Sequence, residues 1–213
     1  MIMSILEKAN FIKYLGTYID KHLTWKEHIN LICKKVSKNI GIISKLRHYV
    51  DRESCRMVYF SLVYPYLQYG AMTWGSTYKT RINSLHILNN KAVRTITFSH
   101  FQAHAPPIYK SLGILQLKDI VFTQIATFMY DYYNSNLPSA FSNYFKNIAQ
   151  VHRHNTRQSN LNLHLSAVST NYGKFSLKFS GVKVWNSIDK SVRNAPRKSF
   201  IKKVKETCFS TYQ

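Results

Sequence analysis

Apolar residues recur at helical spacing between residues 24 and 48, and this pattern predicts the first long helix of the chain. Thr24 and Glu27 stand in the order of a capping box, with Thr24 as the N-cap and Glu27 at the third helical position. We expect the helix to run from there to about His48. Its apolar stripe consists of Trp25, Ile29, Ile32, Val36, Ile40, Ile43 and Leu46.

Further helices follow from the same periodicity. One begins at Asp51 and continues to a break at Tyr64-Pro65, because proline removes a backbone donor and disfavours helix in the preceding residue. Another begins near Thr80, and its apolar face is formed by Ile82, Leu85, Leu88, Ala92, Val93 and Ile96. The next ends at Leu137-Pro138, and its inward face is formed by Ile120, Val121, Ile125, Phe128, Met129 and Tyr132.

Two segments between and after these helices are expected to form single turns. Pro106-Pro107 is predicted to break the chain before a short turn over 108–112 that Gly113 closes. One more turn is expected over 141–145. All three tryptophans stand at apolar turns and are expected in the core: Trp25, Trp74 and Trp185.

After Gln150 the helical period fades. Alternating apolar residues predict two short strands with one polar face, at Leu161, Leu163 and Leu165 and at Phe175, Leu177 and Phe179. The chain then ends in a basic helix marked by Phe200, Val204 and Cys208.

The segment Tyr14–Asp20 is aromatic and β-branched, which predicts one strand. Because the helices that follow supply no partner strand, we expect its partners upstream in a larger sheet. The fold class is therefore mainly α: a helical bundle with a short N-terminal β element and a small C-terminal part of irregular or β structure plus a helix. The predicted divisions are 1–23, 24–149 and 150–213, the last a basic subdomain or tail.

Charge gives the first indication of a partner. The chain has 30 Lys and Arg against 9 Asp and Glu, a net charge of +21, while 45% of its residues are hydrophobic, which is enough for a folded core. The excess lies in two blocks: residues 21–110 hold 14 basic and 3 acidic residues, and residues 150–213 hold 12 and 2. A polyanionic partner is therefore expected.

The first long helix concentrates part of this charge away from its apolar stripe, at Lys34, Lys35, Lys38, Lys45 and Arg47. A run of charges is most often a solvated face. Here a single acid at the start of the helix leaves the other cations without Glu–Lys pairing. We therefore favour a phosphate-facing helix and expect charge reversal at Lys34, Lys35 and Lys38 to weaken nucleic-acid binding.

The sequence contains few residues that are suited to catalysis or to metal binding. Among the nine acids only Asp51 and Glu53 lie close together, and no phosphate loop, dinucleotide fingerprint or nucleophile elbow occurs. The nine histidines and three cysteines form no ligand pairs at zinc spacing. We expect no metal, no cofactor and no small-molecule substrate.

The compartment and the membrane are judged from composition. The N-terminus lacks the apolar run of a signal peptide, no glycosylation sequon occurs, and the three cysteines are widely spaced. A reducing location, cytoplasmic and/or nuclear, is predicted. The uncharged stretch 57–78 is long enough to span a bilayer, but its Pro, Gly and Tyr content favours a buried helix and a turn, so no membrane partner is expected.

Seven short strings, in order along residues 11–187, resemble the C-terminal part of the reverse transcriptases of non-LTR (LINE, jockey-like) retrotransposons. They are Lys13-Tyr14-Leu15-Gly16 with Tyr18-Ile19-Asp20; Leu23-Thr24-Trp25-Lys26-Glu27-His28-Ile29; Tyr64-Pro65-Tyr66-Leu67-Gln68-Tyr69-Gly70 with Trp74-Gly75; Leu88 with Lys91-Ala92, Arg94 and Ile96; Ser111-Leu112-Gly113-Ile114-Leu115; Asn155-Thr156-Arg157; and Gly181, Lys183 and Trp185-Asn186-Ser187.

The resemblance implies the end of a polymerase palm in residues 1–23, a helical thumb and connector over 24–149, and a template–primer duplex or RNA–DNA hybrid as partner. The family's Tyr/Phe-x-Asp-Asp motif is absent from the sequence, so we expect a fragment that does not polymerise DNA by itself. No catalytic residue is predicted. The predicted nucleic-acid-binding residues are Lys34, Lys35, Lys38, Lys45, Arg47, Arg81, Lys91, Arg94, Arg157 and Lys183.

Two other hypotheses remain open at this stage. The chain could be a non-functional helical remnant of a decayed mobile element, which a cooperative thermal melt would argue against. It could also be held at a membrane surface by its positive charge, which predicts binding to anionic vesicles and none to DNA.

Overall fold

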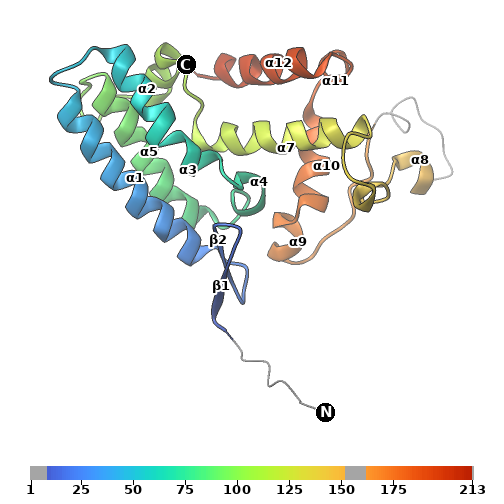
Figure 1. Ribbon diagram of the computed structural model, residues 1–213. Helices are drawn as coiled ribbons and strands as arrows, with labels where there is room; N and C mark the ends of the chain where they lie inside the picture. The colour runs from blue at the N-terminus through green and yellow to red at the C-terminus, as the bar shows by residue number, and fades with distance from the viewer. Residues whose placement is uncertain (1–8, 152–161, 213) are drawn as a thin grey trace.

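A computed structural model of the protein describes residues 9–151 and 162–212, and within these residues it is mainly helical, as predicted (Figure 1). One β-hairpin stands at the N-terminal end. Its strands are β1 Phe11–Tyr14 and β2 Thr17–Asp20. The helices are α1 Lys26–Leu46, α2 Arg52–Leu62, α3 Tyr64–Gln68, α4 Ala71–Trp74, α5 Lys79–Ile96, α6 Ala105–Leu112, α7 Leu117–Tyr133, η1 Ser139–Phe141, α8 Ile148–Val151, α9 Asn171–Phe175, α10 Leu177–Ser187, α11 Lys190–Arg193 and α12 Arg197–Ser210.

The hairpin corrects the prediction of a single strand. Leu15 and Gly16 both have positive φ, 44° and 79°, and make the two-residue turn that joins the antiparallel strands. Such a turn matches the natural twist of a hairpin. The partner strand therefore lies immediately before the predicted one, in register from Phe11 opposite Asp20 to Tyr14 opposite Thr17.

The start of α1 corrects the predicted capping box. Trp25 is the N-cap and adopts a left-handed conformation, so the helix begins at Lys26 and Thr24 does not cap it as predicted. The carboxylate of Asp20 accepts hydrogen bonds from the backbone N–H groups of Thr24, at 3.0 Å, and Trp25, at 2.7 Å. The hairpin thus supplies the polar group that fixes the approach of the chain to α1.

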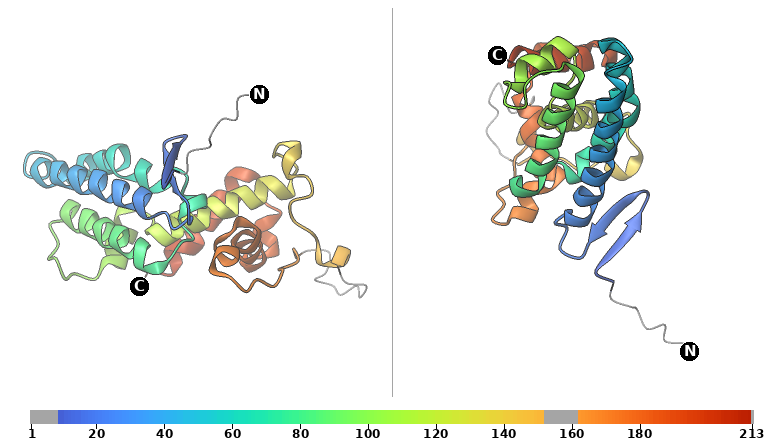
Figure 2. Two further views of the ribbon diagram at one scale, coloured as in Figure 1. Left: turned by 90° about the horizontal axis from the view of Figure 1, so that it is seen from below. Right: turned by 90° about the vertical axis from the view of Figure 1, so that its left-hand side faces the viewer.

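The helices α1 and α5 lie parallel and side by side, both running away from the hairpin (Figure 2). In the N-terminal halves of the two helices Cys33 Sγ lies 3.6 Å from Ser84 Oγ, and at their far ends Arg47 donates to the carbonyl of Thr95. The chain returns from the far end of α1 to the start of α5 through α2, α3 and α4. Most of the predicted stripe of α1 is buried: Ile29, Ile32, Val36, Ile40 and Ile43.

The long helix α7 joins this helix pair to the C-terminal part of the chain, because α10 and α12 pack against it (Figures 1 and 2). Trp74 and Trp185 are fully buried, as expected, and Trp25 is partly buried against the same core. The hydroxyl of Tyr212 donates to the buried Asp119 carboxylate at 2.5 Å and accepts from the N–H of Gln116 at 2.8 Å. These bonds fasten the C-terminal segment to the start of α7.

Two predictions between and after the long helices are wrong. Pro106-Pro107 stands in the first turn of α6. Backbone N–H groups in the first turn have no hydrogen-bond partner within the helix, so proline is tolerated there and the helix begins at Ala105 instead of after the prolines. Phe175, Leu177 and Phe179 belong to two helices that meet at Ser176, the extended N-cap of α10. Leu163 forms an isolated bridge with Asn147, and Leu161 lies outside the described residues.

Within the described residues no single helix combines the length and the apolar character needed to cross a bilayer. The bent pair α6 and α7 meets both criteria only when the two helices are taken together across a 53° bend.

His28, on the first turn of α1, joins the hairpin to the helices. Its side chain is 3% exposed, lies edge-on to Trp25 and Trp74, and accepts a hydrogen bond at Nδ1 from the N–H of Tyr18, at 3.4 Å. The other ring nitrogen, Nε2, is buried without a hydrogen-bond partner in the described part of the chain. Burial, and then the charge of Lys35, lower the pKa of His28 below its usual 6.5.

We therefore expect the protein to lose stability as the pH falls below about 6.5, because the unfolded histidine takes up a proton before the folded one does. Above that pH both states are neutral at this position, and the effect vanishes. Urea midpoints between pH 5 and 8 would measure it. His28→Phe should weaken the pH dependence, whereas His22→Asn, at an exposed position nearby, should retain it. Equal slopes for wild type and His28→Phe would contradict this role.

Candidate nucleic-acid interface

Three lysines form an outward face of α1. Lys34, Lys38 and Lys45 are separated by four and seven residues, a spacing that places them on one side of a helix. All three are exposed, and this side points away from the buried stripe of Ile32, Val36 and their neighbours. We call these three residues the lysine face.

No ion pair within residues 9–151 and 162–212 neutralises the charge of the lysine face. In the described part of the chain the ion pairs join Arg56 to Glu53, Arg197 to Asp131 and Lys202 to Glu206, none of which lies on α1. The one acid of α1 is Glu27, in its first turn. An uncompensated row of ammonium groups attracts polyanions, because contact with phosphate releases condensed counterions.

The lysine face is also open. Gly41 stands between Lys38 and Lys45 on the same side of the helix, and a Cβ atom built there would meet nothing within 4 Å. Glycine in a helix interior costs about 1 kcal/mol relative to alanine, and no packing contact within the described chain requires it here. The helix surface at Gly41 is therefore open between Lys38 and Lys45.

The other predicted binding residues lie on several elements. Lys35 is exposed beside the lysine face, and its ammonium lies 5.0 Å from the centre of the Tyr66 ring on α3. Arg81 and Lys91 are exposed on α5, the helix that packs along α1. Lys183 is exposed on α10, in the C-terminal part. Arg157 lies outside the described residues.

Two of the predicted arginines are engaged inside the protein. Arg47 donates to the carbonyl of Thr95 at 3.2 Å, and its guanidinium lies 4.4 Å from the centre of the Phe98 ring. Arg94 donates through Nε to the carbonyl of Ala103 at 2.8 Å. Both are half-buried, and each fastens a loop to a helix. Both were predicted as cations off the apolar stripes, but residue spacing carries no signal of these tertiary hydrogen bonds.

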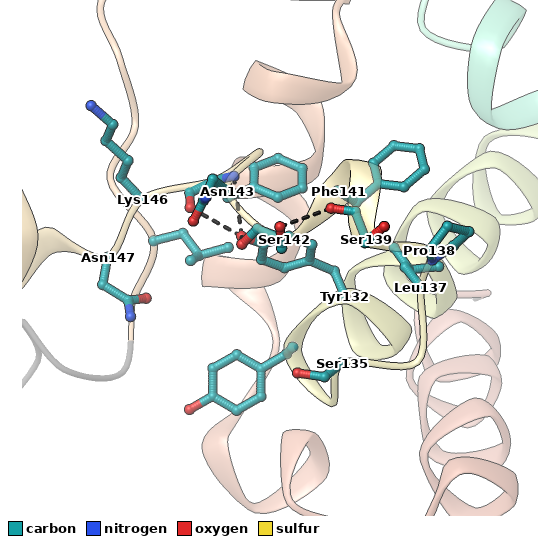
Figure 3. A pocket seen from close by; sticks show the side chains of 13 residues that line it. Tyr132, Ser135, Leu137, Pro138, Ser139, Phe141, Ser142, Asn143, Lys146 and Asn147 are labelled. Atoms are coloured by element: carbon teal, nitrogen blue, oxygen red, sulfur yellow. Dashed lines mark hydrogen bonds between the residues drawn. The ribbon is translucent and has the colours of Figure 1, made fainter.

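A pocket of about 900 Å³ lies at the C-terminal end of α7 (Figure 3). Tyr132 holds its wall together, because its hydroxyl donates to the carbonyl of Phe145 at 3.0 Å. Lys146 is the one charged residue among those that line it, and the rest are aromatic, aliphatic, hydroxyl or amide side chains. Such a lining offers shape and hydrogen bonds but no carboxylate for acid–base or metal chemistry.

The described residues contain no group of three His, Cys, Asp or Glu side chains placed to hold a metal ion. The buried groups with raised pKa values are phenols, thiols and one carboxyl: burial raises the pKa of Cys208 to about 11 and that of Asp119 above its usual value. Cys208 on α12 and Asp119 on α7 are both buried, and neither lies on α1. The arrangement is therefore suited to electrostatic binding.

Comparison with known proteins supplies an independent observation. The chain is 28% identical over 116 residues to a probable RNA-directed DNA polymerase from transposon BS of Drosophila melanogaster, covering 52% of this chain and 12% of that protein. It is 29% identical over 110 residues to the RNA-directed DNA polymerase from mobile element jockey of the same species, covering 50% and 12%. A probable polymerase from transposon X-element matches at 25% over 116 residues, 53% of this chain and 13% of the relative.

The chain thus aligns with only about one eighth of the length of these relatives. No protein-family profile matches it, and no solved structure matches it significantly. The four curated matches agree with the family that the seven sequence strings indicate. Over about half of its length, this chain is similar to the RNA-directed DNA polymerases of non-LTR retrotransposons.

Proposed function

We propose that the chain is a template–primer-binding fragment of a retrotransposon RNA-directed DNA polymerase, and that it lacks the catalytic carboxylates of that enzyme. The observation that carries this proposal is the lysine face: three exposed cations on one side of α1, opposite its buried stripe and without an ion-pair partner among the described residues. The similarity to transposon polymerases supports the choice of nucleic acid over other polyanions.

The proposed contact is with phosphate groups rather than base edges. Lysine side chains are flexible point charges, and a row of them on a helix follows a nucleic-acid backbone without reading its sequence. Binding should therefore tolerate any sequence and depend steeply on salt. Arg81 and Lys91 on the neighbouring α5 and Lys183 on α10 are proposed as further phosphate contacts.

The test uses the whole 213-residue chain and a labelled RNA–DNA hybrid, with fluorescence anisotropy as the readout. The affinity should fall by at least tenfold as the salt concentration rises from about 50 to about 200 mM, as counterion release requires. Anionic vesicles are the comparison, and they should compete poorly. With a primed template, magnesium and nucleotides, no primer extension is expected, because the sequence has no adjacent pair of acids.

An affinity that is unchanged across this salt range would contradict phosphate binding. Binding to vesicles without binding to the hybrid would assign the basic surface to membranes instead. Magnesium-dependent extension of the primer would show that a catalytic site exists in the chain.

A further inference from the structure

A second surface lies at the far ends of α1 and α5, where the loops 47–51 and 97–104 meet. The 97–104 loop is held by its own backbone and by Arg94. The N–H of Ser99 donates to the carbonyl of Arg94 at 3.1 Å, the N–H of Ala103 donates to the carbonyl of His100 at 2.9 Å, and Arg94 Nε donates to the carbonyl of Ala103. The conformation of the loop is therefore fixed at both ends.

Phe98 stands in this loop in a left-handed conformation, with φ 54°. It follows the C-cap of α5, a position where glycine is usual because a side chain makes that conformation unfavourable. The ring is kept there by two residues that follow α1: the Arg47 guanidinium lies 4.4 Å from its centre, and His48 meets it edge-on at 5.6 Å. The surroundings thus hold an aromatic ring at the surface at a conformational cost.

The rings of this surface are unusually exposed. Tyr49 is 86% exposed, Phe101 72% and Phe98 58%, although aromatic side chains gain most when they are buried. His100 packs against Phe101 with the ring centres 4.4 Å apart. We call Tyr49, Phe98 and Phe101 the aromatic tip.

We propose that the aromatic tip stacks unpaired bases of a single-stranded stretch of nucleic acid, next to the duplex held by the lysine face. This proposal rests on the proposed function and extends it. Exposed aromatic rings beside cations are the means by which proteins hold single strands, because every base has a face that stacks and every nucleotide has a phosphate.

The charge near the aromatic tip favours a nucleic acid as its partner. Lys45 of the lysine face lies one helical turn before Tyr49, and Arg47 lies between them. Between residues 28 and 118 the acids are Asp51 and Glu53. Both are engaged at the start of α2: Asp51 accepts from the N–H of Ser54 at 3.2 Å, and Glu53 pairs with Arg56 at 2.7 Å. A phosphate backbone therefore approaches the tip from the side of Lys45, away from the start of α2.

The test compares the whole chain with the double variant Y49A/F101A, which removes two exposed rings and leaves Phe98 with its contact to Arg47. The control is Tyr172→Ala, an exposed tyrosine on α9, at the other end of the protein from the tip (Figure 1). The probes are a blunt RNA–DNA hybrid, the same hybrid with a single-stranded extension, and single strands of DNA and RNA. The fluorescent base 2-aminopurine in the unpaired positions reports stacking by quenching.

The wild type and Tyr172→Ala should quench 2-aminopurine and bind the extended hybrid more tightly than the blunt one. The double variant should lose the quenching and at least about tenfold in affinity for single strands, while its affinity for the blunt hybrid stays within about twofold. Unchanged quenching and single-strand affinity would overturn the tip proposal and leave the proposed function standing.

Two other outcomes also decide the matter. If the wild type binds neither the hybrid nor single strands, both proposals fail. If the wild type self-associates in sedimentation and the double variant does not, while single-strand binding is unaffected, the tip is a protein contact and the stacking proposal is overturned.

Discussion

Changing Lys34, Lys38 and Lys45 together to glutamate is expected to lower the affinity for an RNA–DNA hybrid by more than about a hundredfold at about 0.15 M salt. The logarithm of the binding affinity falls with the logarithm of the salt concentration, with a slope of about 0.9 for each phosphate contact. At about 0.15 M salt, counterion release therefore raises the affinity about fivefold per contact, and the loss of three contacts lowers it by more than about a hundredfold. Repulsion between the new carboxylates and phosphate adds to the loss. Lys35 is left in place because it contacts Tyr66.

A matched control separates this face from the net charge of the protein. Changing Lys190, Lys198 and Lys203 to glutamate reverses three exposed charges on α11 and α12 and alters the net charge equally. That variant should lose much less affinity. All six positions are exposed, so both variants should melt near the wild-type temperature. Equal losses of affinity in the two variants would show that positive charge anywhere on the protein is enough for binding.

The largest expected effect on stability is that of Gly75→Ala. Gly75 is the C-cap of α4, and a Cβ atom there would overlap the methyl groups of Val121 on α7 and the carbonyl oxygen of Ala71. Neither neighbour is free to move, because Val121 and Ala71 are both buried in the core. Overpacking of this severity costs about 3 kcal/mol or more, a large part of the stability of a protein of this size.

Gly41→Ala is the matched control, because the same substitution there meets open space. It should raise the free energy of unfolding by up to about 1 kcal/mol through helix propensity alone. Urea unfolding followed by circular dichroism would measure both variants. If Gly75→Ala were as stable as the wild type, the close approach of α4 to α7 would be wrong.

The helices were predictable where burial in the core repeats apolar residues at helical spacing over many turns. The stripe of α1 was predictable because each of its turns buries one or two β-branched or aliphatic residues. The start of α2 was predicted at Asp51, and in the structure Asp51 is the N-cap and accepts from the N–H of Ser54. The hairpin was missed because Leu15-Gly16 lacks the Asn-Gly or Asp-Gly signal of such turns. Three apolar residues at alternate positions over 175–179 are compatible with a strand and equally with the end of one helix and the start of the next.

The binding residues were predictable only in part. Lys34, Lys38 and Lys45 follow from periodicity, because a residue off the buried stripe of a surface helix points to solvent. That Arg47 and Arg94 donate to the carbonyls of Thr95 and Ala103 depends on tertiary packing, which no local pattern encodes. The aromatic tip was missed for a related reason, since its residues follow the last turns of α1 and α5, outside any stripe.

The central claim is that the lysine face contacts phosphates, and the most direct measurement is the salt dependence of binding by the wild type and by a variant with Lys34, Lys38 and Lys45 changed to alanine. A plot of log affinity against log salt loses a slope of about 0.9 for each phosphate contact removed. The variant should therefore show a slope smaller by about 2.7. An unchanged slope would contradict the claim, because it would mean that these lysines touch no phosphate.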